Sequence, residues 1–283
     1  MRIGHWVALA ALALGLSTIA PSARADESEV HYRSALAFKR QNRLDEALRE
    51  ARVAVRLRPS HLAAQFTIGS ILRQQGNYEG ALAAFRQVLV GAPNDARANA
   101  MAGAVLVRLN RWAEALPYLG KACDADATDA SSFGNLSVAL RRLNRFEEAI
   151  GAAERGLARS PQNADLLNNL GVALRSANRM DEAARAFQRA IVIRPTDPQL
   201  ELNLGVALRS SRHFDQAIPH YQRATDLQPN NADAWFDLGV CFEQLGRADD
   251  AVRAYTRYAD IVRARNPGAA TRAEERIRNV RGH

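Results

Sequence analysis

The 283-residue chain has few of the residues that bind metals or give a globular core its bulk. Aromatic residues make up 6% of the sequence, and only two cysteines are present, Cys123 and Cys241. No two histidines lie at metal-ligand spacing, and no cysteine pair accompanies them. The sequence therefore predicts no metal site.

The chain also lacks a recognisable catalytic constellation. Its glycines recur at positions suited to helix packing and turns, so they do not form a phosphate-binding loop. Ser137 and Ser210 have no identifiable base near them in the pattern. His213 and His220 are expected to be solvated. We therefore predict that the chain is not an enzyme and uses no cofactor.

Long apolar runs are missing after residue 25. Residues 1–25 differ from the rest, with Arg2 at the start, an apolar run from Trp6 to Leu16, and Ala23, Arg24 and Ala25 as a small-x-small cleavage site. This pattern predicts a secretory signal peptide and a mature chain that begins at Asp26. An uncleaved anchor is the alternative, but the run is shorter than the roughly 20 apolar residues that span a bilayer. We expect export to a bacterial periplasm and no membrane span after cleavage.

The basic residues are almost all arginine. Lys39 and Lys121 are the only lysines among 38 basic residues, and the net charge is +8. Asp and Glu are interspersed, so no continuous basic tract suggests nucleic acid. Together with the predicted export, this makes acidic protein segments or anionic envelope polymers better candidate partners than nucleic acid.

A 34-residue period organises the rest of the chain. Five prolines and seven alanines fall on it, and such a period indicates stacked helix–turn–helix units. The residues are Pro59, Pro93, Pro161, Pro195 and Pro229, and Ala47, Ala81, Ala115, Ala149, Ala183, Ala217 and Ala251. A period of this length predicts an array in which each unit contacts its neighbours. The two cysteines then lie more than three repeats apart, and both fall among apolar positions, so we expect buried free thiols.

Each repeat reads as helix A over positions 1–14 and helix B over positions 18–31. Predicted N-cap positions before helix A are filled by His61, Asp95, Asp129, Asn163, Asp197 and Asn231, of which all but His61 are good caps. Position 15 is Gly or Asn in every repeat but one, where Arg212 stands, and Gly and Asn tolerate a left-handed turn. Small residues at position 8, mostly glycine, and Ala at position 20 would let the two helices approach closely. Repeat 4 has Ala153 and Gly156 where larger residues are expected, which predicts a thin core there.

These columns define the pattern of the tetratricopeptide repeat (TPR) family, which the sequence resembles over residues 28–265. The resemblance implies an all-α, right-handed superhelical solenoid of seven helix–turn–helix units. The predicted units are 28–61, 62–95, 96–129, 130–163, 164–197, 198–231 and 232–265. A narrow apolar stripe at Ala270, Ala273, Ile277 and Val280 predicts a capping helix over 266–283.

In TPR proteins the outward face of helix A lines a concave groove that holds extended peptides. On that face, the resemblance makes eleven residues candidate peptide-binding residues. These are Asn135, Asn169, Asn203 and Asp237 at position 6, Val138, Val172 and Val206 at position 9, and Arg73, Arg141, Arg175 and Arg209 at position 12. The asparagines resemble the ladders with which some TPR proteins grip a peptide backbone, since an amide both donates and accepts. Duplication of one unit would also produce these columns.

The sequence thus predicts a non-catalytic protein-binding scaffold of the bacterial envelope. An extended, partly acidic peptide would lie in the groove, with its carboxylates at the arginines. The alternative is a structural array that associates with copies of itself.

Overall fold

The computed structural model describes residues 21–125 and 129–282, and all of its regular structure in that part of the chain is helical. The chain divides into two compact units, residues 1–87 and residues 88–283, and the boundary falls within α4. The first unit contains α1 (Pro21–Arg40), α2 (Leu44–Leu57), α3 (Leu62–Gln74) and most of α4 (Tyr78–Gly91). The second contains α5 (Ala96–Arg108), α6 (Trp112–Ala125), α7 (Ala130–Arg142), α8 (Phe146–Arg159), α9 (Ala164–Ser176), α10 (Met180–Ile193), α11 (Pro198–Ser210), α12 (Phe214–Leu227), α13 (Ala232–Gln244), α14 (Ala248–Val262) and α15 (Pro267–Arg281).

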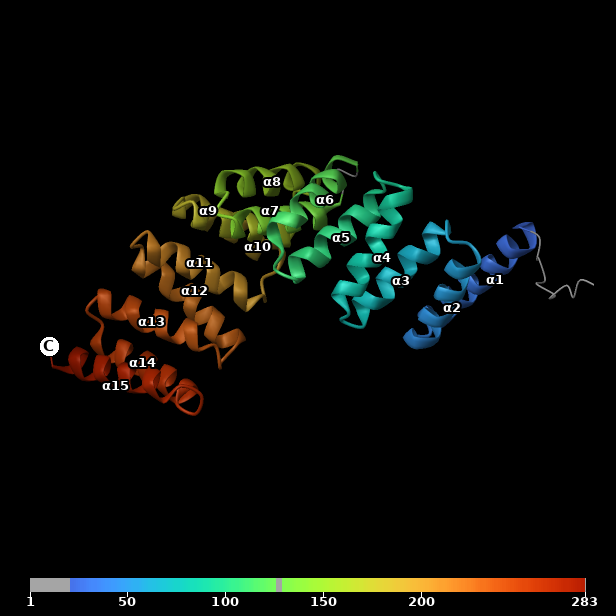
Figure 1. The fold of residues 1–283 in the computed structure, drawn as a ribbon. Helices are drawn as coiled ribbons and strands as arrows, with labels where there is room; N and C mark the ends of the chain where they lie inside the picture. The colour runs from blue at the N-terminus through green and yellow to red at the C-terminus, as the bar shows by residue number, and fades with distance from the viewer. Residues whose placement is uncertain (1–20, 126–128, 283) are drawn as a thin grey trace, which may run out of the picture. The chain divides into compact units, whose positions relative to one another are not determined.

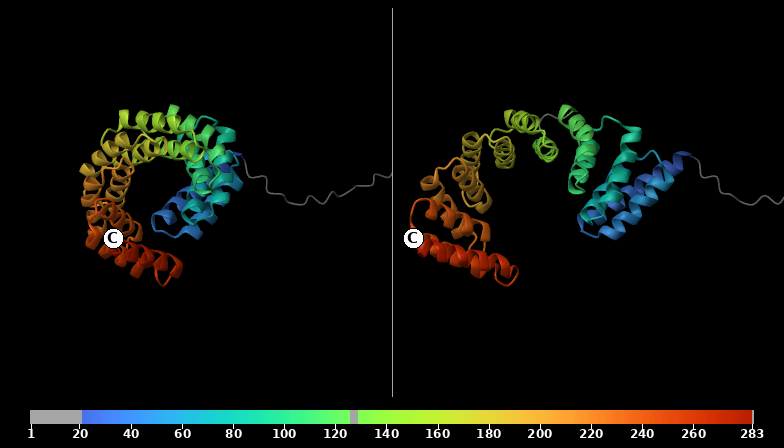
Figure 2. Two further views of the ribbon diagram at one scale, coloured as in Figure 1. Left: turned by 90° about the vertical axis from the view of Figure 1, so that its left-hand side faces the viewer. Right: turned by 60° about the vertical axis from the view of Figure 1, so that its left-hand side comes forward.

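Helices A and B alternate with nearly constant lengths after α1. From α3 to α13 each helix A has 13 residues and begins on the first residue of a predicted repeat. Each helix B has 14 residues, or 15 in α14. In the second unit, successive helix pairs stack in chain order (Figures 1 and 2). The predicted all-α solenoid of helix pairs is therefore confirmed.

The turn between helices A and B is the same in every repeat. Position 15 has positive φ in all seven, and these are the only such residues in the described chain: Asn42, Gly76, Asn110, Asn144, Asn178, Arg212 and Gly246. Arg212, which the sequence does not favour for this conformation, adopts it with φ of 62°. The geometry of the array here prevails over the preference of one residue.

Side-chain caps begin the later A helices. The predicted caps Asp95, Asp129, Asn163, Asp197 and Asn231 each accept a hydrogen bond from a backbone N–H two or three residues on. His61, the least suitable of the six by type, also accepts, through its Nδ1 from the Ala64 N–H at 3.4 Å. These bonds satisfy donors that the first helical turn leaves free.

The core of every repeat contains the alanine column, and in four repeats a glycine–ring contact adds to it. All seven alanines of position 20 are fully buried. The glycine of position 8 lies under the ring of position 24, because a Cβ added to Gly171 would be 2.6 Å from Cε1 of Phe187. Gly69, Gly205 and Gly239 meet Phe85, Tyr221 and Tyr255 in the same way. Glycine at position 8 therefore makes room for a ring, rather than only for the alanine column.

In repeat 4 the buried aromatic ring comes from a different helix. Phe133 of α7 is 2% exposed, and a Cβ added to Gly156 of α8 would be 2.8 Å from the Cβ of Phe133. The ring comes from position 4 of helix A instead of position 24 of helix B. The Phe133 ring is therefore buried between α7 and α8, and Gly156 makes room for it, although a hollow remains beside this repeat on its B-helix side.

Neighbouring repeats of the second unit are joined mainly where a B helix packs on the A helix of the next repeat. Each B helix also packs on its own A helix, and consecutive A helices touch one another, most extensively where α7 meets α5 and α9. The described B helices make no comparable contact with one another. The A helices therefore contact one another along one side of the unit, and the B helices of the other side are separated by the A helices between them.

The array ends with α15, which packs on α14. Ala270 and Ala273 of α15 are buried against Ala259, with Tyr258 and Val262 beside them. Two of the four residues of the predicted stripe, Ala270 and Ala273, therefore face the last helix B, and Ile277 and Val280 are partly exposed.

The predicted signal peptide lies largely outside the described residues, which begin at residue 21. The described part of α1 includes the backbone of the predicted cleavage site, residues 23–25. Among the described helices, none combines the length and the apolarity that a bilayer span requires.

Both cysteines are buried free thiols, as predicted. Burial raises the pKa of Cys123 and of Cys241 to about 12. Neither thiol forms a reactive thiolate at neutral pH while its repeat is folded.

Candidate functional site

The predicted peptide-binding residues of the second unit occupy one face of four A helices. We call this set the A-face site: α7 presents Asn135, Val138 and Arg141, α9 presents Asn169, Val172 and Arg175, α11 presents Asn203, Val206 and Arg209, and α13 presents Asp237. None is fully exposed, since Asn203 is buried and the others are partly buried. The remaining predicted residue, Arg73, is exposed on α3 of the first unit.

The asparagine row takes part in packing between A helices. Asn203 is 7% exposed; its Nδ2 donates to the Oδ1 of Asn168 at 2.9 Å and its Oδ1 accepts from Gln199 at 3.2 Å. The Nδ2 of Asn169 would be 3.1 Å from a Cβ on Gly134 of α7, so that amide covers a glycine of the preceding A helix. An amide has two donor hydrogens and two lone pairs, so these contacts leave part of its capacity for a ligand.

The positive charge of Arg209 is balanced by the carboxylate of Asp237. Its Nε lies 3.6 Å from Oδ1 of Asp237 and donates to the Tyr221 hydroxyl at 3.3 Å. That hydroxyl donates to Oδ2 of Asp237 at 3.2 Å. Burial raises the pKa of Asp237, while Arg209 and the hydrogen bond from Tyr221 oppose that rise. Arg209 and Asp237 therefore form a neutral pair between α11 and α13.

The positive charges of Arg141 and Arg175 are not balanced in this way. In the described part of the chain, neither guanidinium lies within ion-pair distance of a carboxylate, although both side chains are partly buried. Burial lowers the pKa of Arg141, and the charges of Arg142 and Arg175 lower it further. Burial likewise lowers the pKa of Arg175. Two partly desolvated cations on adjacent helices repel each other, and an anion bound between them would relieve both penalties.

A cavity of about 410 Å³ lies on this face between α9, α11 and α13. Five of the predicted residues line it: Arg175, Asn203, Val206, Arg209 and Asp237. The structure thus brings at least one member of the polar, apolar and cationic rows to this hollow, while the predicted residues of α7 lie outside it.

Sequence reasoning missed several residues around this cavity: Gln199, Leu202, Asp233, Phe236 and Tyr258. The first four stand at positions 2 and 5 of helix A, on the groove side, so the helical periodicity could have found them. Tyr258 comes from α14, a B helix. Only the packing of its ring on Phe236, with centroids 5.1 Å apart, places it here.

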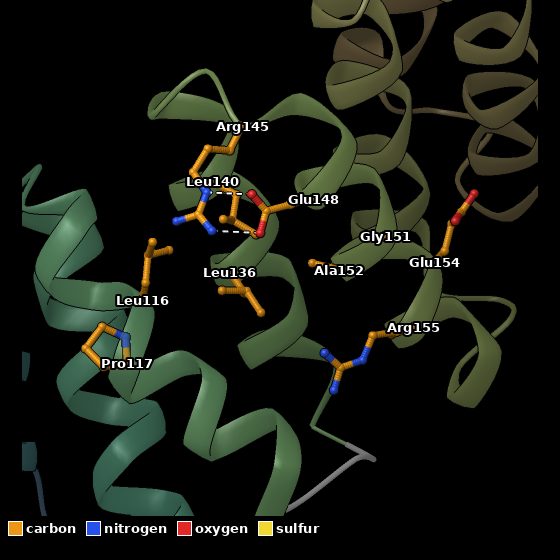
Figure 3. Close-up of a pocket in the computed structure, with 10 residues that line it drawn as sticks. All are labelled: Leu116, Pro117, Leu136, Leu140, Arg145, Glu148, Gly151, Ala152, Glu154 and Arg155. Atoms are coloured by element: carbon orange, nitrogen blue, oxygen red, sulfur yellow. Dashed lines mark hydrogen bonds and ion pairs between the residues drawn. The ribbon is translucent and has the colours of Figure 1, made fainter.

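A larger hollow of about 720 Å³ lies on the B-helix side of repeats 3 and 4. Its floor is apolar, with Leu136 and Leu140 of α7, and Leu116 of α6 stands across from them (Figure 3). Both arginines at its rim are paired, since Arg145 donates twice to Glu148 at 2.7 Å and Arg155 lies 3.1 Å from Asp124. The unpaired cations are on the A-face site, which is why we consider that smaller hollow the better candidate.

His220 is not simply solvated, contrary to the sequence-based expectation. Its Nδ1 lies 2.7 Å from Oε2 of Glu201, whose side chain is 8% exposed. His31 and Glu50 of repeat 1 make the same pair at 2.6 Å with the residue types exchanged. Both pairs join positions 4 and 23, so they link helix A to helix B. Within the described residues, no group of three or more His, Cys, Asp or Glu side chains is arranged to hold a metal ion.

Several solved structures resemble this fold. YrrB, described as a TPR protein with an unusual peptide-binding site, has 23% identity and a TM-score of 0.57, covering 68% of this chain and 98% of its own. PilW, a type IV pilus biogenesis factor, has 21% identity and a TM-score of 0.64, covering 73% and 96%. MamA from Desulfovibrio magneticus RS-1 has 23% identity and a TM-score of 0.57, covering 61% and 97%. These identities show a shared fold only.

The family assignment rests on the sequence match. A comparison with curated proteins gives no significant match. The tetratricopeptide repeat family model matches residues 32–96, 66–130, 135–198 and 202–270, which together cover most of the chain. With its paired helices, left-handed turns and glycine–ring contacts, the chain belongs to the tetratricopeptide repeat family.

Proposed function

We propose that the chain is a non-catalytic protein-binding scaffold whose A-face site holds an extended, partly acidic peptide segment. The observation that carries the proposal is the pair Arg141 and Arg175, partly buried on adjacent A helices without a carboxylate partner in the described chain. A ligand carboxylate would supply that partner through charge-assisted hydrogen bonds.

The remaining features of the site suit a peptide backbone. The amides of Asn135 and Asn169 both donate and accept, so they match main-chain N–H and C=O groups. Val138 and Val172 provide apolar contact between the amide and arginine rows. The peptide-binding site described for YrrB, a protein of similar fold, is consistent with this use.

The bacterial envelope is the proposed place of action. The support is the predicted signal peptide over residues 1–25 and the fold shared with PilW, a pilus biogenesis factor. Intact-mass measurement of the protein purified from its native host tests the export. A mature chain beginning at Asp26 is expected, and a full-length chain would contradict it.

Binding is tested with a fluorescent 12-residue probe peptide of alternating Glu and Ser, compared with its Gln/Ser counterpart. The purified mature chain should bind the acidic peptide more tightly, and the difference should shrink as salt screens the arginines. The variant Arg141→Gln/Arg175→Gln should lose about tenfold or more in affinity, because partly desolvated charged contacts are worth on the order of 1.5–3 kcal/mol each.

The matched control is Arg185→Gln/Arg189→Gln, which removes the same charge from exposed positions of α10. It should bind the acidic peptide nearly as the wild type does, since exposed charges contribute little. Equal losses in both double variants would mean a non-specific charge effect and would contradict the site. No preference for Glu over Gln peptides would contradict the acidic ligand.

A further inference from the structure

We infer that the A-face site selects a segment with two separated charge blocks, an acidic block over α7 and α9 and a basic block at α13. The inference rests on the proposed function and adds the charge pattern and the register of the ligand. It follows from the order in which charges occur along four consecutive A helices.

The first end of the site is cationic. Arg141 on α7 and Arg175 on α9 are unpaired in the described chain, and Arg142 adds a third positive charge beside them. The one acidic groove-side residue of α9, Asp165, does not cancel them. Its two carboxylate oxygens accept from Arg194 at 2.7 and 2.8 Å.

The middle of the site is neutral. Arg209 of α11 and Asp237 of α13 balance each other through the 3.6 Å contact and the shared Tyr221 hydroxyl. A ligand residue here meets Asn203 and Val206 instead of a net charge.

The far end is anionic. Asp233 of α13 is exposed on the rim of the cavity, and in the described chain no cation lies within ion-pair distance of its carboxylate. Its charge acts on Asp237, whose pKa it helps to raise. The other acid of this face, Glu243, is already satisfied by Arg276 of α15 at 2.7 Å. Asp233 is therefore the acid left to attract a ligand cation.

The cavity wall at this end suits a long basic side chain. Phe236 and Tyr258 line it beside Asp233. The aliphatic stem of a lysine or arginine would cover the two rings while its charged end reaches the carboxylate. The cavity thus offers both an apolar surface and an anion to one residue of the ligand.

The spacing of the helices sets the spacing of the blocks. Neighbouring packed helices are roughly 10 Å apart, so the midpoint between α7 and α9 lies roughly 25 Å from α13 across the helices. Arg141 and Arg175 stand near the ends of their helices and Asp233 near the start of its own, which adds roughly 15 Å along the helix axis and gives a separation of roughly 30 Å. An extended peptide covers about 3.3 Å per residue. The acidic and basic blocks should therefore be centred about nine residues apart.

Four 12-residue probe peptides test the inference by fluorescence anisotropy. Two are split peptides, one with three Glu, six Ser and three Lys in that order and one with the reversed order. The third has the same composition with Glu and Lys alternating, and the fourth has three Glu and nine Ser. At least one order of the split peptide should bind about threefold tighter or better than both other peptides, since a partly exposed ion pair is worth a modest amount.

Asp233→Asn should remove the advantage of the split peptide, so that the split peptide and the Glu/Ser peptide bind this variant with similar affinity. The matched control is Asp249→Asn, which removes an exposed acid from the first turn of α14. A photo-crosslinker placed at the Lys end of the split peptide should label α13, and one at the Glu end should label α7 or α9.

The outcomes separate the two proposals. If the Glu/Ser peptide binds as tightly as the split peptide, or Asp233→Asn behaves like Asp249→Asn, the two-block inference fails while the acidic-peptide function stands. If crosslinks from both ends fall on the same helices, the register is wrong. If no acidic peptide binds, the proposed function fails and the inference falls with it.

Discussion

Position 15 of each repeat shows how a single residue is constrained by the array. Six of the seven residues there are Gly or Asn, and Arg212 adopts the same left-handed conformation with φ of 62°. For a residue with a long side chain that conformation costs on the order of 1 kcal/mol, because Cβ crowds the following carbonyl oxygen. The cost is met by the packing of α11 and α12 on either side.

Replacing that arginine should therefore stabilise the protein. Arg212→Asn is expected to raise the free energy of unfolding by about 1 kcal/mol, measured by urea denaturation. The converse change, Asn178→Arg at the same position of repeat 5, should lower it by a similar amount. Equal stability of all three proteins would mean that the turn tolerates any residue.

Some helical glycines of this fold make room for a buried ring, and others have open space beside them. A matched pair of Gly→Ala substitutions distinguishes the two cases. A Cβ on Gly151 of α8 would meet nothing within 4 Å, so Gly151→Ala should gain about 0.5–1 kcal/mol from helix propensity. A Cβ on Gly171 of α9 would be 2.6 Å from a Phe187 ring that is fully buried. Gly171→Ala should lose about 1–3 kcal/mol through overpacking. Thermal unfolding of both variants measures the difference, and a shift of the same sign in both would contradict these packing roles.

At the scale of elements, α15 is fixed to α13 and α14 by one carboxylate. Oε2 of Glu243 accepts from Nε of Arg276 at 2.7 Å and from the Tyr255 hydroxyl at 2.6 Å. Burial acts to raise the pKa of Glu243, but these two hydrogen bonds outweigh it, so the pKa lies below the ordinary value. A lowered pKa in the folded state means that the carboxylate adds stability above the pKa of an unfolded glutamate.

This stability should be lost as pH falls through the folded-state pKa of Glu243. Glu243→Gln is expected to cost about 1 kcal/mol at pH 7, a figure reduced for the partial exposure of Arg276, and to cost progressively less between about pH 5 and pH 3. Urea unfolding across that range measures the effect. Glu274→Gln, which breaks an exposed pair between Glu274 of α15 and Arg263 directly after α14, is the control and should change little. A pH-independent difference would show that the carboxylate charge is not what holds α15.

The sequence predicted the repeated elements well because their determinants are local. A left-handed turn depends on residues such as Asn144 and Gly246, and the cap of α9 on Asn163, and each is visible in one repeat. The alanine column is visible through its period. The charge state of the site was not visible, because the partners of Arg209 and Glu243 come from Asp237 and Arg276 on later helices. The arginine row therefore looked uniform in sequence although one of its members is neutralised.

At the scale of the whole molecule, the stability of each repeat should depend on the repeats that it packs against. Each repeat contacts the next, so a local defect should spread over few helices. Cys241 in α13 and Cys123 in α6 are buried thiols at different places in the second unit, and both can report local opening.

A charge placed under α15 should open one end first. In Ala270→Asp/Ala273→Asp, native-state labelling with a thiol reagent should speed up at Cys241 and stay near the wild-type rate at Cys123. Mass spectrometry of digested protein identifies the labelled residue. Equal acceleration at both cysteines would mean that the second unit unfolds as one cooperative body.

The contacts between consecutive A helices, and the absence of such contacts between the described B helices, also have a mechanical consequence. When the second unit bends, we expect the side on which A helices contact one another to change length less than the side on which the B helices are separated. The hollow between α6 and α8 is the place where that side yields most easily, because Leu116 and the small residue Gly151 leave it unfilled. Under tension or thermal motion, we therefore expect the distances between Arg141, Arg175 and Asp233 to change less than the gaps between the B helices. The spacing of the charged residues in the A-face site would then stay nearly constant while the opposite side of the unit opens and closes.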